Sequence, residues 1–94
     1  MNAHGHALEG ELTIYRAEEL KPQLLAALES GLAGDAEPAF DLSAVTEIDT
    51  SGVQLLLLAR REAAARGKPL QLLAASPAVR DAFALLELDT HLQP

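Results

Sequence analysis

The turn Asp49-Thr50-Ser51-Gly52 carries the two hydroxyl groups of this sequence that are best placed for chemistry. Apolar Val45 and Ile48 precede it, and residues 53–66 follow it without Pro or Gly and end at a glycine. This pattern predicts a strand, a tight turn and a long helix. The hydroxyls would then lie near the unsatisfied amide groups of the helix start.

Two interpretations of this turn stay open from spacing alone. In the first, Thr50 or Ser51 caps the helix through an amide two or three residues on, and Asp49 adds favourable charge, together worth on the order of 1–2 kcal/mol. In the second, Ser51 is a phosphorylation site, where a phosphate adds about −1.5 to −2 charges two residues from Asp49. Gly52 then either leaves room for another protein's active site or serves only as a flexible turn residue.

Four consecutive leucines, Leu55 to Leu58, follow in the predicted helix. At about 100° per residue they spread around most of the helix circumference, so they cannot all face one sheet. Either a neighbouring helix covers one or two of them, or Leu55 or Leu58 forms an exposed apolar patch beside the Ser51 turn that is suited to docking a protein.

Other chemistries are less well supported by the residues. His4 and His6 could meet a metal, but two histidines near a terminus, without a cysteine or an adjacent acidic residue, are a weak signal. A Ser-His-Asp nucleophile would need His91 or an N-terminal histidine beside Ser51, and no glycine-flanked nucleophile elbow is present. The glycines are scattered and do not form a loop that would cradle ATP or GTP. We therefore expect no enzyme activity, no cofactor and no metal.

Composition bounds the remaining possibilities. The length of 94 residues suits a single domain over 1–94. Apolar residues make up 49% of the chain and aromatic residues only 3%, which predicts a core of Leu, Ala, Val and Ile. Seven basic against 14 acidic residues give a net charge of −7, which argues against direct nucleic-acid binding. The absence of Cys excludes disulfides and thiolate chemistry and fits a reducing compartment.

Targeting signals are not visible in the sequence. The first twenty residues lack a basic start and an apolar run, so we expect no secretory signal. The longest uncharged run of the apolar helix, residues 50–59, is short of the ~20 apolar residues that span a bilayer. These observations predict a soluble, cytoplasmic protein without membrane insertion.

The N-terminal half predicts a strand and a helix. Residues 7–14 alternate loosely between apolar and polar, with Gly10 inside, which favours two short strands or one strand broken at the glycine. Residues 17–30 carry leucines at helical spacing, and Gly31 is the expected stop. Pro22 favours a regular helix that begins only near Leu20.

The remaining segments continue the alternation. Residues 39–42 and 70–73 are short apolar runs that suit buried strands, and Ser76-Pro77 predicts the start of a helix with Val79, Phe83 and Leu86 on its apolar face. Strands that alternate with helices indicate an α/β fold in which short parallel or mixed strands are covered by helices.

The run from Phe40-Asp41-Leu42 to Asp49-Thr50-Ser51-Gly52-Val53, followed by the leucine-rich helix, resembles the STAS family of sulphate transporters and anti-sigma-factor antagonists. Leu8 to Thr13, Glu18-Glu19-Leu20, Gly67-Lys68 and Ser76-Pro77 fall in the same order as in that family, so the resemblance covers nearly the whole chain. It implies a mixed sheet of four to five strands with helices packed largely on one face.

The resemblance also implies a function. In anti-sigma-factor antagonists of this family a partner serine kinase phosphorylates the turn serine, here Ser51, and a phosphatase removes the phosphate. The unmodified protein binds its partner, an anti-sigma factor or other signalling protein, and the phosphorylated one releases it. Asp49, Thr50 and Gly52 shape the contacted surface, with Leu55 and Leu58 beside them. ATP belongs to the kinase, and the bacterial regulator is expected to be monomeric alone.

Two further interpretations stay open beside the switch. Similar stand-alone STAS proteins accompany chemotaxis-type signalling systems or form the small cytoplasmic subunit of an ABC-type phospholipid transport complex. In the transport complex the helix and turn would bind the ATPase subunit constitutively, and Thr50 would matter more than Ser51. The last alternative is an inert scaffold in which Ser51 is only a cap.

Overall fold

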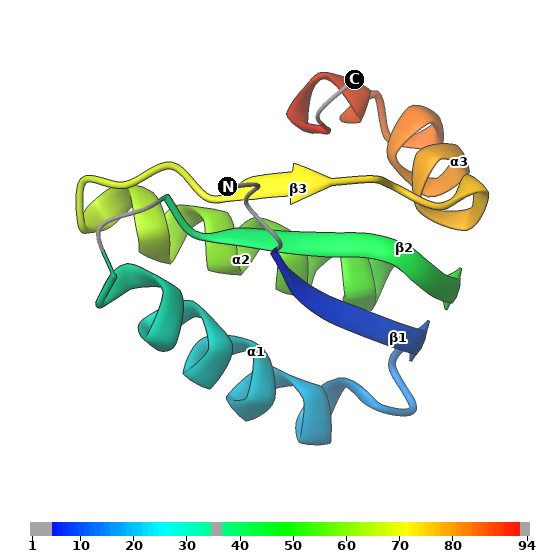
Figure 1. Ribbon diagram of the computed structural model, residues 1–94. Helices are drawn as coiled ribbons and strands as arrows, with labels where there is room; N and C mark the ends of the chain where they lie inside the picture. Colours follow the sequence, from blue (N-terminus) through cyan, green and yellow to red (C-terminus); the bar gives the residue numbers. More distant parts are fainter. Residues whose placement is uncertain (1–4, 35–36, 93–94) are drawn as a thin grey trace.

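The fold alternates strands and helices along the chain (Figure 1). The computed structural model describes residues 5–34 and 37–92. The elements, in order, are β1 (His6–Leu12), α1 (Ala17–Leu32), β2 (Ala39–Ile48), α2 (Thr50–Ala65), β3 (Gln71–Leu73), α3 (Pro77–Leu85) and the 3-10 turn η1 (Asp89–His91). The α/β fold class inferred from the sequence is confirmed.

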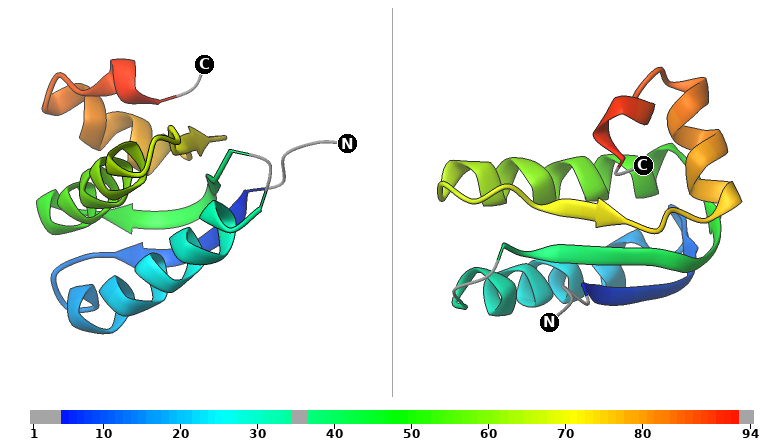
Figure 2. Two further views of the ribbon diagram at one scale, coloured as in Figure 1. Left: turned by 90° about the vertical axis from the view of Figure 1, so that its left-hand side faces the viewer. Right: turned by 45° about the horizontal axis from the view of Figure 1, so that its top comes forward.

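The three strands form a parallel sheet in the order β1-β2-β3. Parallel neighbours are joined by crossover helices, and such crossovers are almost always right-handed. Two consecutive crossovers in the same direction place α1 and α2 on the same face, where they contact each other (Figure 2). The third helix, α3, lies past the end of β3 and packs mainly against β2.

The expected mixed sheet of four to five strands is not confirmed within the described part of the chain. The first strand is a single element, because Gly10, at φ 78°, absorbs a register shift without ending the pairing with β2. After α3 the chain forms η1 rather than a further strand. All the observed strand pairs are parallel.

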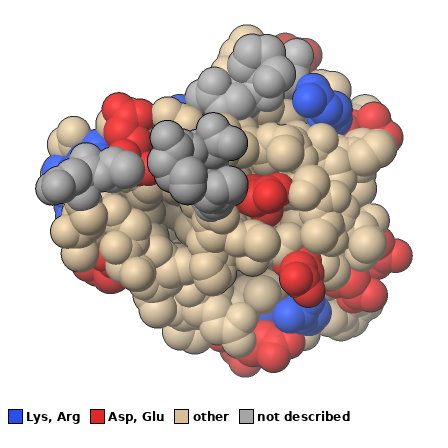
Figure 3. All heavy atoms as spheres, in the orientation of Figure 1, with Lys and Arg blue, Asp and Glu red and all other residues tan. Residues whose placement is uncertain are grey.

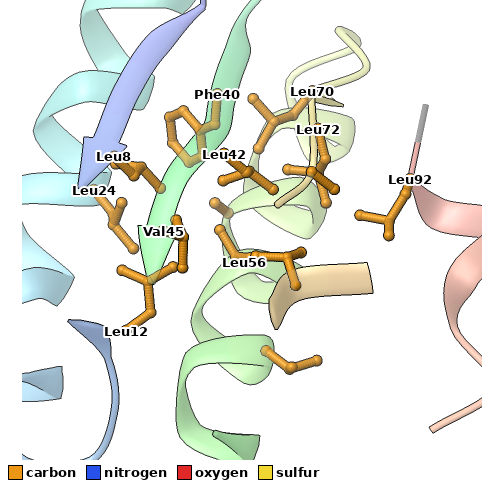
Figure 4. Packing of buried hydrophobic residues seen from close by; sticks show 14 of the residues in the cluster. Leu8, Leu12, Leu24, Phe40, Leu42, Val45, Leu56, Leu70, Leu72 and Leu92 are labelled. Carbon is orange, nitrogen blue, oxygen red and sulfur yellow. The ribbon is translucent and has the colours of Figure 1, made fainter. Parts of the chain in front are cut away.

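A core of aliphatic side chains joins the sheet to its helices (Figure 4). On β2 the buried Phe40 and Leu42 alternate with the half-exposed Asp41, as expected for a strand covered on one face. The helices contribute residues at helical spacing, among them Leu20, Leu24 and Leu28 of α1. The largest fully buried side chains are Phe40, Phe83, Leu12, Leu28, Leu42, Leu56, Leu72, Val53 and Val79.

The expected late start of the first helix is wrong. α1 begins at Ala17, because Arg16 pairs with Glu19 across its first turn and the Leu20 amide donates to the Arg16 carbonyl at 2.9 Å. Pro22 is accommodated on the exposed side of the helix. The helix also continues through Gly31 and ends at Leu32.

The start of α3 follows the sequence prediction. The Ser76 hydroxyl accepts a hydrogen bond from the Val79 amide at 3.3 Å, and Pro77 occupies the first turn. Val79 and Phe83 are buried, whereas Leu86 is 44% exposed because the helix ends at Leu85.

A close backbone approach fixes where α2 begins. Gly52 is buried, and a Cβ atom placed on it would lie 2.0 Å from the Leu12 carbonyl oxygen and 2.8 Å from Cγ1 of Ile48. No side chain fits between the helix and the end of β1. The glycine therefore sets the position of the turn that carries Thr50 and Ser51.

We expect Gly52→Ala to destabilise the fold by at least about 1 kcal/mol, because the steric overlap outweighs the roughly 1 kcal/mol by which alanine favours a helix over glycine. Urea unfolding measures this change. Gly34→Ala is the control, since among the described residues its Cβ would meet only the Gly31 carbonyl oxygen, at 3.7 Å. Equal stabilities of the two variants would contradict the packing argument.

Candidate functional site

Asp49 joins the turn to the end of β1. It is the N-cap of α2, and its Oδ1 accepts a hydrogen bond from the Gly52 amide at 3.1 Å. Its Oδ2 accepts from the Ile14 amide at 2.9 Å, and its own amide donates to the Leu12 carbonyl at 3.2 Å. The sequence interpretation of a cap at Thr50 or Ser51 is therefore corrected, because the extended backbone of Asp49 places its carboxylate at the helix start.

These hydrogen bonds keep the carboxylate charged. The pKa of Asp49 is lowered from its ordinary value, chiefly by the bond from the Ile14 amide, with smaller contributions from the amides of Gly52 and Ser51. Partial burial opposes this shift without reversing it. A fixed negative charge thus stands at the start of α2, where the helix dipole also favours it.

The two hydroxyl residues of the turn differ in their surroundings. Thr50 is exposed, whereas Ser51 is half-buried and lines a groove between α1 and α2. Neither hydroxyl makes a hydrogen bond to the rest of the described chain. A group added to the Ser51 oxygen would therefore break no existing bond.

This groove, the α1–α2 groove, has a volume of about 510 Å³. Two elements line it, with α1 supplying two residues and α2 supplying six. The lining residues are Ala17, Lys21, Ser51, Gln54, Leu55, Leu57, Leu58 and Arg61.

The leucine run is divided between core and groove. Leu56 is fully buried, while Leu55, Leu57 and Leu58 are half-buried and all three line the α1–α2 groove. The sequence offered two alternatives, cover by a neighbouring helix or an exposed apolar patch. Neither describes the observed arrangement fully, because α1 covers these three leucines only in part. Leu55 and Leu58 share one groove with Ser51, which the partner-surface hypothesis requires.

Charge in the α1–α2 groove is opposite to that of the whole protein. Its charged lining residues are Lys21 and Arg61, and none is acidic. Neither cation forms an ion pair with a described carboxylate. The chain has a net charge of −7, and the face in Figure 3 shows more acidic than basic side chains.

At their other ends the two helices are tied together. Arg66, after α2, forms an ion pair with Glu29 of α1, and the bond lowers the pKa of the Glu29 carboxyl. The Lys68 ammonium donates to the carbonyls of Leu32 and Gly34. These contacts hold the helix ends close, while the groove stays open nearer the Ser51 turn.

Sequence reasoning missed several residues of this region. Lys21 and Arg61 are 40 positions apart, and only the packing of α1 against α2 brings them into one groove. Ile14 and Tyr15, in the loop after β1, are 63% and 92% exposed. The amide of Ile14 is bonded to Asp49, so this apolar pair lies beside the start of α2. Their exposure is a tertiary property that no local sequence signal carries.

The alternative sites gain no support. His6 is exposed and packs edge-on against Phe40, while His4 lies outside the described residues. Residues 5–34 and 37–92 contain no group of three side chains that could hold a metal ion. His91 contacts Arg60 of α2 rather than Ser51. Of the described histidines, neither His6 nor His91 makes a hydrogen bond to Ser51.

Comparison with known families identifies the fold. Residues 3–94 match the family model described as "Mlab, STAS domain". The chain belongs to this STAS family. No curated protein matches its sequence.

Two solved structures of SpoIIAA resemble this STAS domain. The anti-sigma factor antagonist SpoIIAA in its unphosphorylated form is 26% identical, with a TM-score of 0.71 over 99% of this chain and 82% of that one. The Bacillus cell fate determinant SpoIIAA in the phosphorylated form is 25% identical, with a TM-score of 0.63 over 93% of this chain and 77% of that one. The similarity supports a regulatory protein-interaction module.

The longest helices, α1 and α2, have 16 residues each. In the part of the chain that the structure describes, no helix is both long and apolar enough to span a membrane.

Asp49→Asn should remove a pH-dependent part of the stability. The folded pKa of Asp49 is lowered below the ordinary value of about 3.9, so the ionised group stabilises the fold above that value and the contribution is lost as pH falls through the folded pKa. Wild type should exceed the variant in thermal midpoint at pH 7, and the difference should shrink as the pH is lowered below about 3.9.

Glu9→Gln is the matched control for this experiment, because it removes an exposed strand carboxylate that accepts no hydrogen bond from the described residues. Its thermal midpoint should stay close to that of the wild type at neutral pH. The role given to the ionised carboxylate would be contradicted if the difference in thermal midpoint between wild type and Asp49→Asn were equally large at pH 7 and at acidic pH.

Proposed function

We propose that this STAS domain is a non-enzymatic, cytoplasmic regulator that binds a protein partner when Ser51 is unmodified and releases it when Ser51 is phosphorylated. The carrying observation is the position of Ser51, whose hydroxyl is free of hydrogen bonds to described residues and lines the apolar groove beside the start of α2. A serine kinase would add the phosphate and a phosphatase would remove it.

Charge explains how the modification would act. A phosphate on Ser51 brings about −1.5 to −2 charges two residues from Asp49, whose lowered pKa keeps it ionised. Two anionic groups at one helix start repel an acidic partner surface and remove the apolar character of the groove entrance. The fold is retained, because the helix amides are already capped by Asp49 and the added group replaces no bond.

The proposed contact surface extends around the turn. Thr50 is exposed, and the exposed pair Ile14 and Tyr15 lies beside it through the bond to Asp49. Leu55 and Leu58 form its apolar part within the groove. Gly52 is buried, so it would act indirectly by fixing the position of Ser51. The partner would be an anti-sigma factor with kinase activity or another signalling protein.

A second candidate is the small subunit of an ABC-type phospholipid transport complex that binds the ATPase subunit constitutively. The three half-buried leucines in the α1–α2 groove favour it, because partly exposed apolar side chains suit a permanent interface. In this candidate binding is independent of the state of Ser51.

Ser51→Asp should weaken binding to the protein partner by at least about tenfold, because a like charge is placed against the partner surface. Ser51→Ala should bind as the wild type does, and Ser30→Asp is the matched control, because it adds the same charge at an exposed position of α1 outside the groove and away from the turn. The partner would be co-purified with tagged Ser51→Ala protein from the native host, and affinities measured by calorimetry. Unfolding midpoints verify that the variants fold.

The outcomes separate the candidates. Phosphate located on Ser51 by mass spectrometry of the native protein, together with weakened binding of Ser51→Asp, supports the switch. An ATPase that binds wild type and Ser51→Asp equally supports the transport subunit. Unmodified Ser51 under all growth conditions, with binding unaffected by the substitution, contradicts the switch.

A further inference from the structure

The α1–α2 groove has the form of a binding site for a third helix. Its walls are two helices that lie side by side on one face of the sheet, and ridges of a further helix pack into such grooves. The floor is apolar, from Leu55, Leu57 and Leu58, and Ala17 leaves room on the α1 side. Lys21 is exposed and lines the groove, and the alkyl chain of a lysine can cover apolar surface while its ammonium stays in water.

The charges of the groove indicate which charge a bound ligand should carry. Of the seven basic residues, Arg16, Arg66 and Lys68 bond to described carboxylates or carbonyls and Arg60 contacts His91. Lys21, Arg61 and Arg80 have no such partner in the described structure, and of these three Lys21 and Arg61 line the groove. In a protein of net charge −7, two cations that line an apolar groove with no acidic residue among its lining complement an anionic apolar ligand.

We propose that the α1–α2 groove binds an acidic amphipathic helix of the partner protein, with aliphatic side chains on the leucines and carboxylates paired with Lys21 and Arg61. This proposal rests on the proposed function and names the chemistry of its partner. A phosphate on Ser51 competes with those carboxylates, because it places its charge in the same groove and neutralises the two cations that attract the partner.

The test uses two synthetic peptides of about 18 residues with leucines at helical spacing. One carries glutamates beside the leucine stripe and the other carries lysines at the same positions. Binding to the full chain is measured by fluorescence anisotropy, and amide shifts of Gln54, Leu55 and Leu58 locate the peptide. The wild type should bind the glutamate peptide at least about tenfold more tightly than the lysine peptide, with an affinity that falls as salt is raised.

Charge reversal is the decisive variant. Lys21→Glu with Arg61→Glu should invert the preference between the peptides, whereas Arg80→Glu, an exposed substitution on α3 outside the groove, should leave it unchanged. Ser51→Glu should weaken binding of the glutamate peptide severalfold. Equal binding of both peptides, a preference that survives the double reversal, or amide shifts confined to another face overturns the proposal. Self-association of the wild type through the groove, seen by sedimentation, also overturns it by making a second copy the occupant.

Failure here is distinct from failure of the switch. If Ser51→Asp releases the native partner while Lys21→Glu with Arg61→Glu does not, the groove does not bind a helix of the partner, and the phosphorylation switch is still supported. If the double charge reversal inverts the peptide preference while Ser51→Asp changes binding of neither the peptide nor the partner, the phosphorylation switch is contradicted and helix binding in the groove is supported.

Discussion

The carbonyl oxygen of Leu12 is the point at which β1, β2 and α2 meet. The Asp49 amide donates to it at 3.2 Å, and Gly52 passes so near that a Cβ would come within 2.0 Å of it. The Asp49 carboxylate completes the junction through the amides of Ile14 and Gly52. The direction of α2, the place of Ser51 and the opening of the groove all depend on this crowded contact.

Sheet topology explains why the functional features gather at one end. In parallel strands joined by helices, the carboxyl ends of β1 and β2 lie at the same edge, so the loop with Ile14 and the turn with Ser51 are neighbours. The two crossover helices share a face and create the groove between them. The opposite ends are held by Arg66 and Glu29, which leaves the open part of the groove beside the turn.

Local patterns predicted the elements better than the contacts between them. The helix after Asp49-Thr50-Ser51-Gly52 and the Ser76 cap could be predicted because capping and apolar spacing act over a few residues. The predicted start of α1 was wrong because it rested on the penalty for Pro22 alone, whereas the contacts of Arg16 with Glu19 and with the Leu20 amide begin the helix at Ala17. The expected four to five strands came from the family resemblance, and the segments around 39–42 and 45–48, expected as separate strands, form the single strand β2. The break considered at Gly10 is a register shift within β1.

In the candidate site, too, the sequence predicted individual residues better than the contacts between them. Ser51 and the leucines beside it are visible in the sequence, and the structure puts them in one groove. Lys21 and Arg61 were not predictable as a pair, since their proximity follows from helix packing rather than from spacing. The capping role of Asp49 was assigned to its neighbours, because backbone conformation decides which of several polar residues caps a helix.

The bond between the Ile14 amide and Asp49 joins residues 35 positions apart, with all of α1 and β2 between them. Such a contact cannot form in a partly folded chain until β1 and β2 have paired around the intervening helix, because the loop closure must come first. The turn that carries Ser51 therefore has its observed form only in a chain whose β1 and β2 have come together. A kinase that recognises its three-dimensional form would modify only molecules that have finished folding, and the turn would double as a checkpoint of chain maturity.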